Sequence, residues 1–138
     1  MPDGRVISPG LFTTGAEGPR LIASRCDKCD RLQFPADPSC PYCGAEGTSR
    51  VPVGPSARLW LYTAVTTRPA GYRGPVPYGF GIVELPEGVR IVTRLTEAAL
   101  DRLQEGMSMR LVIEPLHTDD EGVPVLSYAF APERGAQP

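Results

Sequence analysis

The chain has 138 residues and a formal net charge of −2, and 22% of its residues are charged. Its 16 prolines and 15 glycines are too many for a helical protein, so we expect short strands joined by many turns. Lys28 is the one lysine and the arginines are scattered along the chain, which argues against a surface that binds a polyanion.

Residues 1–19 are predicted to form an irregular N-terminal segment, because prolines and glycines interrupt every short run. This segment lacks the apolar stretch of an export signal, and no apolar run in the chain is long enough to span a membrane. Paired cysteines without an export signal are typical of a reducing compartment, so we expect a cytoplasmic protein.

All four cysteines occur in two CxxC pairs, Cys26–Cys29 and Cys40–Cys43. Two such turns supply four thiolates, the closed tetrahedral set that structural Zn²⁺ prefers. Gly44 follows the second pair, where the chain bends back and often needs a positive φ, and Asp30 at the matching position tolerates that region better than most residues. We therefore predict a structural zinc site. Two disulfides are the alternative to a metal site. A redox-active cysteine pair is disfavoured, because the redox motif is a single CxxC near a βαβ pattern.

A rubredoxin-like zinc ribbon is predicted for residues 20–50. Residues 21–25 form a strand that leads into the first cysteine pair, and residues 31–35 return from that pair as its partner strand. The sequence Val-Pro-Val-Gly-Pro at residues 51–55 is expected to be a joint without regular structure.

A five-stranded OB-fold barrel with one short helix is predicted for residues 51–132, followed by a loose tail at residues 133–138. Strands are expected at 57–67, 80–84, 89–95, 107–116 and 123–130, with the helix starting at Thr96–Glu97 and a C-cap at Gly106. Five strands with a helix after the third are typical of an OB-fold. Alternation along the first strand predicts one face made of Leu59, Leu61, Thr63 and Val65, and an opposite face made of Arg58, Trp60, Tyr62 and Thr66.

The loop of residues 68–78 is the best candidate for a functional surface, because it is long and rich in proline and glycine. Aromatic and guanidinium groups stand in it and just after it, at Tyr72, Arg73, Tyr78 and Phe80. A stiff frame presents such groups at low entropic cost, which favours contact with a partner. The alternative for Tyr78 and Phe80 is that their rings close one end of the barrel.

Side chains suited to catalysis are scarce in this sequence. Nucleophilic catalysis commonly uses a cysteine or a serine beside a histidine base. Every cysteine belongs to the predicted metal site, and His117, the one histidine, is expected in a polar turn of residues 117–122. The acidic run Asp119–Glu121 is interpreted as a solvated part of that turn. We therefore predict no catalytic residues.

Several short motifs follow one another in a set order along residues 21–132. They are Arg25-Cys26-x-x-Cys29, Phe34-Pro35, Cys40-Pro41-x-Cys43-Gly44, Leu61-Tyr62-Thr63-x-Val65, Pro77-Tyr78, Val83-Glu84-Leu85, Glu87-Gly88, Gly106-Met107 and Phe130-x-Pro132. This series resembles the bacterial and archaeal zinc-ribbon/OB-fold proteins of the DUF35 family. Two features depart from that family: Asp30 replaces a glycine, and the N-terminal segment is too broken to form the helical arm that many members carry.

The resemblance implies a protein that supports chemistry done by another chain. Members of this family form stable complexes with thiolase-like enzymes, among them thiolases, hydroxymethylglutaryl-CoA synthases, lipid-transfer-protein-like aldolases and some acyltransferases. In those complexes the family member supports its partner and can border the acyl-CoA channel. It therefore implies a non-catalytic accessory subunit of a hetero-oligomer that processes acyl-CoA. The implied cofactor is structural Zn²⁺, and a CoA thioester is the implied ligand of the complex. An arginine such as Arg73 suits a CoA phosphate.

Two other functions remain as alternatives. The first alternative is a nucleic-acid-binding module, because OB-folds often stack nucleic-acid bases on aromatic side chains. A net-negative chain with scattered arginines lacks the cation-driven affinity that such binding needs. A free-standing acyl-CoA-binding protein or enzyme is the other. No nucleic-acid partner and no membrane partner is expected.

Overall fold

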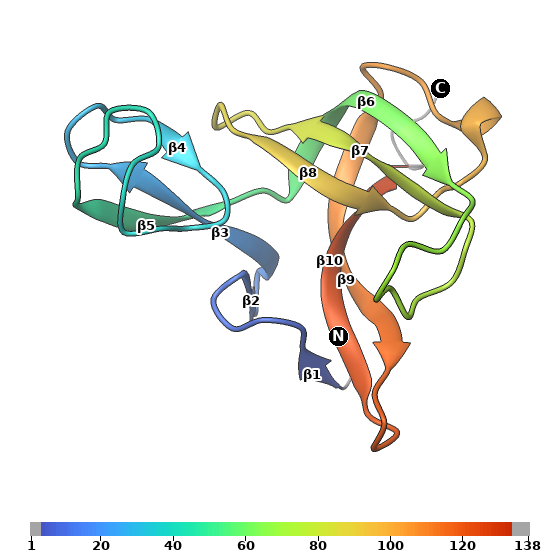
Figure 1. Cartoon of the computed structure of the whole chain (residues 1–138). Coiled ribbons are helices and arrows are strands. Elements are labelled where there is room, and N and C mark those ends of the chain that lie inside the picture. Colours follow the sequence, from blue (N-terminus) through green and yellow to red (C-terminus); the bar gives the residue numbers. More distant parts are fainter. Residues whose placement is uncertain (1–3, 134–138) are drawn as a thin grey trace.

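Short strands make up most of the chain, as the proline and glycine content predicts. The computed structural model describes residues 4–133 (Figure 1). The strands are β1 Arg5–Val6, β2 Phe12–Gly15, β3 Gly18–Cys26, β4 Leu32–Gln33, β5 Thr48–Val53, β6 Ser56–Val65, β7 Tyr78–Glu84, β8 Arg90–Leu95, β9 Ser108–Thr118 and β10 Pro124–Pro132. One 3₁₀ turn, η1 Leu100–Arg102, lies between β8 and β9. None of the helical structure within residues 4–133 is long and apolar enough to cross a membrane.

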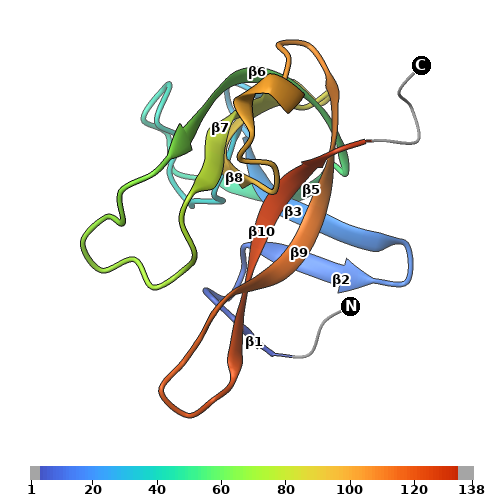
Figure 2. The same cartoon turned by 90° about the vertical axis from the view of Figure 1, so that its right-hand side faces the viewer.

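Five strands close into a barrel, which confirms the predicted fold class. The larger sheet has the order β1-β10-β8-β7-β6-β9, and β9 also pairs with β10, so β6 to β10 form a ring (Figures 1 and 2). All pairings within the ring are antiparallel except that of β10 with β8. The smaller sheet joins β2, β3, β4 and β5, with β3 at its centre.

The N-terminal segment is more regular than the sequence analysis predicts. β2 and the start of β3 form a hairpin in which Phe12 pairs with Leu21 and Gly15 pairs with Gly18. The glycines therefore lie at the turn and leave the strand itself unbroken; Gly18 adopts a φ of 94°. β1 adds to the edge of β10 in parallel, outside the barrel ring. The predicted tail lies, apart from Glu133, outside the described residues.

The expected joint at residues 51–55 is also shorter than predicted. β5 continues through Pro52 to Val53, pairing Pro52 with Ile22. A proline is tolerated there because β5 pairs only with β3, and its free edge needs no N–H donor. The change of direction is confined to Gly54 and Pro55, where Gly54 has a φ of 94°.

A β-bulge in β6 overturns the predicted faces of that strand. Leu59 pairs with Val83 but Leu61 pairs with Ile82, so the register shifts at Trp60. One extra residue reverses the alternation of side chains beyond it. Leu59 is therefore buried, whereas Leu61 points to solvent and is 52% exposed. Tyr62 turns inward and packs against the core, contrary to the prediction.

Two further elements differ from their predicted limits. The predicted helix after Thr96 is reduced to η1, because Ala99 at its start is extended and makes no side-chain cap. β9 extends to Thr118, so His117 is a half-buried strand residue. The polar turn is limited to Asp119–Gly122, where the N–H of Gly122 donates to the carbonyl of Asp119 at 3.0 Å.

The ribbon and the barrel share one hydrophobic core, as the small size of each leads us to expect. Leu21, Ala23 and Val53 of the smaller sheet are fully buried in the same cluster as Leu59 and Phe130 of the barrel. The core therefore crosses the boundary that the sequence analysis places between residues 50 and 51.

The glycines of β7 face the barrel interior and allow close packing, which generates a test. A Cβ on Gly81 would overlap the carbonyl oxygen of Leu61 in the neighbouring strand. Gly81→Ala is therefore expected to destabilise the protein by about 1 to 3 kcal/mol, measured by urea denaturation. Gly15→Ala is the control, since nothing lies within 4 Å of its added Cβ. Equal denaturation midpoints for the parent and Gly81→Ala would contradict this account of β7.

Candidate functional site

The four cysteine sulfurs gather at one end of the smaller sheet. Within residues 4–133, they form the one group of potential metal ligands that the structure brings together, with all four Sγ atoms within 4.8 Å of one another. The Sγ–Sγ distance is 3.6 Å for Cys26–Cys43 and 3.6 Å for Cys29–Cys40. Zn–S bonds of about 2.3 Å in a tetrahedron imply sulfurs about 3.8 Å apart. The cluster therefore fits a zinc ion, whereas a disulfide requires about 2.05 Å.

The two cysteine turns repeat the same backbone geometry. In each turn the carbonyl of the first cysteine accepts a backbone hydrogen bond and its N–H donates another. Its sulfur accepts a third hydrogen bond from a backbone N–H within the turn. The first turn has Asp30 N–H to Cys26 O at 3.0 Å, Cys26 N–H to Arg31 O at 2.9 Å and Lys28 N–H to Cys26 Sγ at 3.4 Å. The second has Gly44 N–H to Cys40 O at 3.0 Å, Cys40 N–H to Ala45 O at 2.9 Å and Tyr42 N–H to Cys40 Sγ at 3.4 Å.

The residues after each turn adopt the conformation that the sequence analysis predicts. Gly44 has a φ of 75° and Asp30 a φ of 67°. Among the described residues Asp30 is the only non-glycine with a positive φ. Its backbone carbonyl accepts a hydrogen bond from Arg25 Nη1 at 3.2 Å, which supports this unusual conformation. An aspartate thus performs the turn that a glycine usually makes.

The electrostatics of the cluster favour a thiolate at Cys26. The backbone N–H groups of Cys29 and Lys28 lower the pKa of the Cys26 thiol to about 6, although burial acts in the opposite direction. For Cys29, the N–H of Arg31 lowers the pKa, but burial and the neighbouring sulfurs prevail and raise it to about 11. The raised pKa of Cys29 opposes the deprotonation that binding of a metal ion by this thiol requires, and a bound cation would offset that cost.

The predicted contact loop is ordered by a chain of stacked side chains. The rings of Tyr72 and Tyr78 lie 4.9 Å apart, Arg68 lies 6.0 Å from the Tyr72 ring centre, and Arg94 lies 5.6 Å from that of Tyr78. The Tyr72 hydroxyl donates to the carbonyl of Pro75 at 2.8 Å. The structure therefore brings Tyr72 and Tyr78 together.

Arg73 and Phe80 lie apart from this stack. Arg73 forms an exposed ion pair with Asp120 at 2.8 Å, which ties the loop to the β9–β10 turn. Phe80 lies on the outer face of β7 and is 37% exposed, so its ring does not close the barrel. Sequence reasoning missed Arg94, whose guanidinium pairs with Glu114 at 2.9 Å. The sequence feature that could have identified Arg94 is its position as a charged residue within a mostly apolar strand.

The acidic residues near His117 form a turn that is capped by the side chain of Asp119. The carboxylate of Asp119 accepts the N–H groups of Val123 and Glu121, each at 2.9 Å. These hydrogen bonds lower the pKa of the Asp119 carboxyl below its ordinary value, and the bond from Val123 has the largest effect. The Arg5 guanidinium lowers the pKa further. The carboxylate therefore stabilises the turn. His117 Nδ1 is buried without a hydrogen-bond partner among the described residues.

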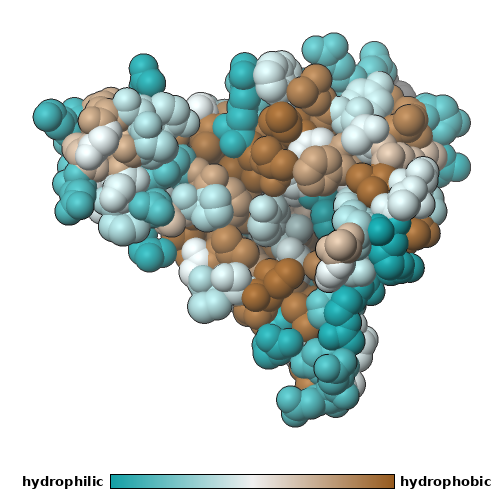
Figure 3. All heavy atoms as spheres, viewed as in Figure 1, coloured by the Kyte–Doolittle hydropathy of each residue, from teal (hydrophilic) through white to brown (hydrophobic). Residues whose placement is uncertain are grey.

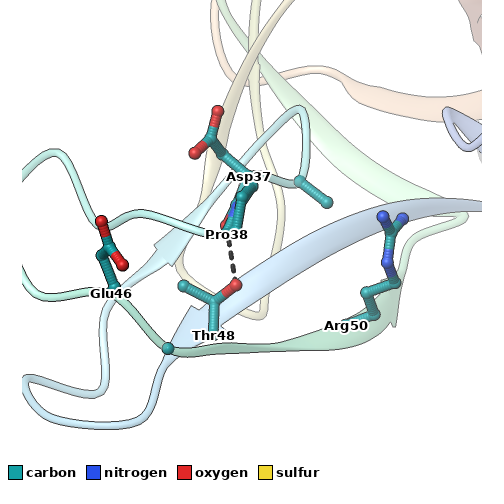
Figure 4. Close-up of a pocket in the computed structure, with 7 residues that line it drawn as sticks. Asp37, Pro38, Glu46, Thr48 and Arg50 are labelled. Atoms are coloured by element: carbon teal, nitrogen blue, oxygen red, sulfur yellow. Dashed lines mark hydrogen bonds between the residues drawn. The ribbon is translucent and has the colours of Figure 1, made fainter.

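A hollow of about 520 Å³ lies on the ribbon beside β5 (Figure 4). It is lined by Ala36, Asp37, Pro38, Glu46, Gly47, Thr48 and Arg50. Thr48 Oγ1 donates to the carbonyl of Asp37 at 2.7 Å, the bond drawn in Figure 4. That carbonyl also accepts from Ser24 and Gln33, so the polar groups fasten the loop to the sheet.

Comparison with known proteins identifies relatives along most of the chain. Residues 13–49 match the family model described as "ChsH2, rubredoxin-like zinc ribbon domain", and residues 50–114 match "ChsH2, C-terminal OB-fold domain". The benzoylsuccinyl-CoA thiolase subunit BbsA of Thauera aromatica is 33% identical over 94% of this chain and 89% of its own length. A DUF35 domain-containing scaffold protein of Pyrococcus furiosus is 29% identical over 82% of this chain and 83% of its own.

A solved structure shows the same architecture. The Ltp2-ChsH2(DUF35) aldolase contains a chain that superposes with a TM-score of 0.64 and 31% identity. The superposition covers 82% of this chain and 84% of that one.

Proposed function

Since the chain belongs to the DUF35 family of zinc-ribbon/OB-fold proteins, we propose that it is a non-catalytic accessory subunit of a thiolase-like acyl-CoA enzyme. The observation that carries this proposal is the similarity to BbsA, a named thiolase subunit, over 94% of the chain. The likeness to a chain of the Ltp2-ChsH2 aldolase supports the same kind of partner. The expected setting is a cytoplasmic hetero-oligomer.

The charge distribution agrees better with a protein partner than with nucleic acid. Seven arginines of the described chain already pair with carboxylates, namely Arg5, Arg25, Arg73, Arg90, Arg94, Arg102 and Arg110. A phosphate backbone would have to compete with these pairs for each guanidinium. This disfavours the nucleic-acid-binding alternative.

We propose that Cys26, Cys29, Cys40 and Cys43 hold one structural Zn²⁺. The support is the sulfur geometry together with the ribbon model that spans residues 13–49. When bound, the ion supplies no chemistry beyond holding the two cysteine turns together, because four thiolates leave no open coordination position. The backbone N–H groups on Cys26 and Cys40 orient their sulfurs toward the shared centre.

We further propose that the surface of Tyr72, Arg73, Tyr78 and Phe80 contacts the partner and borders its acyl-CoA channel. The stacked rings give a rigid frame, and a preorganised surface loses little entropy on binding. Arg73 is half exposed and its ion pair with Asp120 is solvated, so its guanidinium can exchange that carboxylate for a CoA phosphate.

The metal is tested by replacing one ligand. Cys40→Ser is expected to lose Zn²⁺, measured by inductively coupled plasma mass spectrometry. It is also expected to abolish the cooperative thermal transition of ribbon and barrel together, because they share one core. Glu46→Gln, an exposed change on the same ribbon, serves as the control. A Cys40→Ser protein that keeps the melting temperature of the parent would refute the structural role of the metal.

The accessory role is tested by co-expression. Each thiolase-like protein of the source genome is produced with and without this chain, and one of them is expected to co-purify through gel filtration. The pair is expected to process its acyl-CoA, while the isolated chain shows no thiolysis, condensation or aldol cleavage. Turnover by this chain alone would overturn the proposal, and so would failure of every such protein to bind it.

The contact loop is tested on that purified pair. Tyr72→Ala and Arg73→Ala are each expected to raise the Kd for the partner about tenfold, as loss of an interface anchor does, measured by biolayer interferometry. Arg102→Ala is the matched control, an exposed arginine with its own weak ion pair on η1. Unchanged affinity in both loop variants would exclude this loop from the interface.

A further inference from the structure

The outer face of the β6–β7–β8 sheet carries an exposed apolar row. Leu61, Ile82 and Val92 are direct cross-strand neighbours on three successive strands. Leu61 is 52% and Val92 55% exposed, and Phe80 lies two residues before Ile82 on the same face of β7. Figure 3 shows hydrophobic side chains gathered over this part of the barrel. In a soluble protein, side chains with this patterning normally face a core.

The bulge at Trp60 is the cause of this exposure. Without it, the alternation of β6 would turn Leu61 toward the interior, as the sequence analysis expects. With it, Leu59 stays inside and Leu61 joins Trp60 outside. Bulges often re-aim side chains near functional sites. Here the bulge moves a leucine from the core to the surface and turns Tyr62 toward the core in its place.

Charged groups border the row on both of its sides, and they are balanced. On one side the Arg90 guanidinium lies 3.8 Å from the ring centre of Trp60 and pairs with Glu84 at 3.1 Å. On the other side Arg94 pairs with Glu114. An apolar centre with a polar rim, enriched in aromatic side chains and arginine, is typical of a protein–protein interface. The absence of unbalanced positive charge among these residues argues against a phosphate-rich ligand or an anionic lipid surface.

We propose that this face, made of Trp60, Leu61, Phe80, Ile82 and Val92, docks an apolar patch of the thiolase-like subunit. The inference rests on the proposed function and extends it, because Phe80 and Tyr78 make the face continuous with the contact loop. One partner surface can therefore cover both. The balanced rim fits an uncharged protein patch, and the relatives named as enzyme subunits indicate whose patch it is.

The face is tested by placing charge on it. Leu61→Glu and Val92→Glu each put a carboxylate at an already exposed position, so the fold is expected to persist. Each is expected to raise the Kd for the co-purified partner at least tenfold. Leu100→Glu is the matched control, since Leu100 is 48% exposed on η1, and its Kd is expected to stay within twofold of the parent. Thermal melts confirm that all three variants fold.

The outcomes separate this inference from the proposed function. If no thiolase-like protein binds the parent chain, the accessory role itself fails. If the parent binds and both glutamate variants bind equally well, only the face is wrong. It is also wrong if the parent self-associates through this face, so that Leu61→Glu converts a dimer to a monomer in sedimentation without altering partner affinity.

A second measurement needs no substitution. Trp60 is the only tryptophan of the chain, so labelling this chain with 5-fluorotryptophan gives one ¹⁹F resonance at the edge of the face. Addition of unlabelled partner is expected to shift that resonance. An unchanged resonance in the saturated complex would overturn the proposal.

Discussion

The rest of the structure depends on the mutual proximity of four sulfur atoms. In the smaller sheet β2 and β4 are short, and the sheet contributes only a minority of the buried core cluster, too little to fold by itself. The cysteine cluster stabilises its far end, and the shared core with Leu21, Ala23 and Val53 stabilises its near end. Free energy gained by a metal ion bound at the proposed site would therefore reach the barrel through packing. Ribbon and barrel are better regarded as one cooperative unit than as two modules joined by a linker.

The second feature of the structure is the division of the barrel's hydrophobic residues between its inner and outer faces. Gly79 and Gly81 let neighbouring strands approach on the inner side of β7, while Phe80 and Ile82 between them face outward. The bulge in β6 then reverses the alternation of that strand. The same two devices that close the barrel thus expose an apolar row on its outside. An exposed apolar row of this kind is typical of an interaction surface, which agrees with the proposed docking of a partner there.

Features set by short stretches of sequence could be predicted, and features set by tertiary packing could not. The cysteine spacing, the positive φ of Asp30 and Gly44, and the order of strands after residue 55 all follow from local patterns. The bulge at Trp60 could not be predicted, because a strand with an alternating sequence pattern shows the same pattern whether or not it contains a bulge. β1 and β2 were missed because their partners are distant or because their glycines lie in turns. The Arg94–Glu114 pair joins two strands that neither periodicity nor spacing connects.

The groups with lowered pKa values lie where they stabilise the fold. Enzymes concentrate shifted pKa values in a cleft, where acids and bases face a substrate. Here the lowered pKa values of Cys26 and Asp119 have structural causes, a cysteine turn and a capped loop respectively. What the molecule does present to solvent is a stacked aromatic loop beside an apolar sheet face. A rigid apolar surface with few titrating groups suits binding, because it gains from dehydration and loses little entropy. This agrees with the proposed accessory role, in which the partner supplies the catalytic groups.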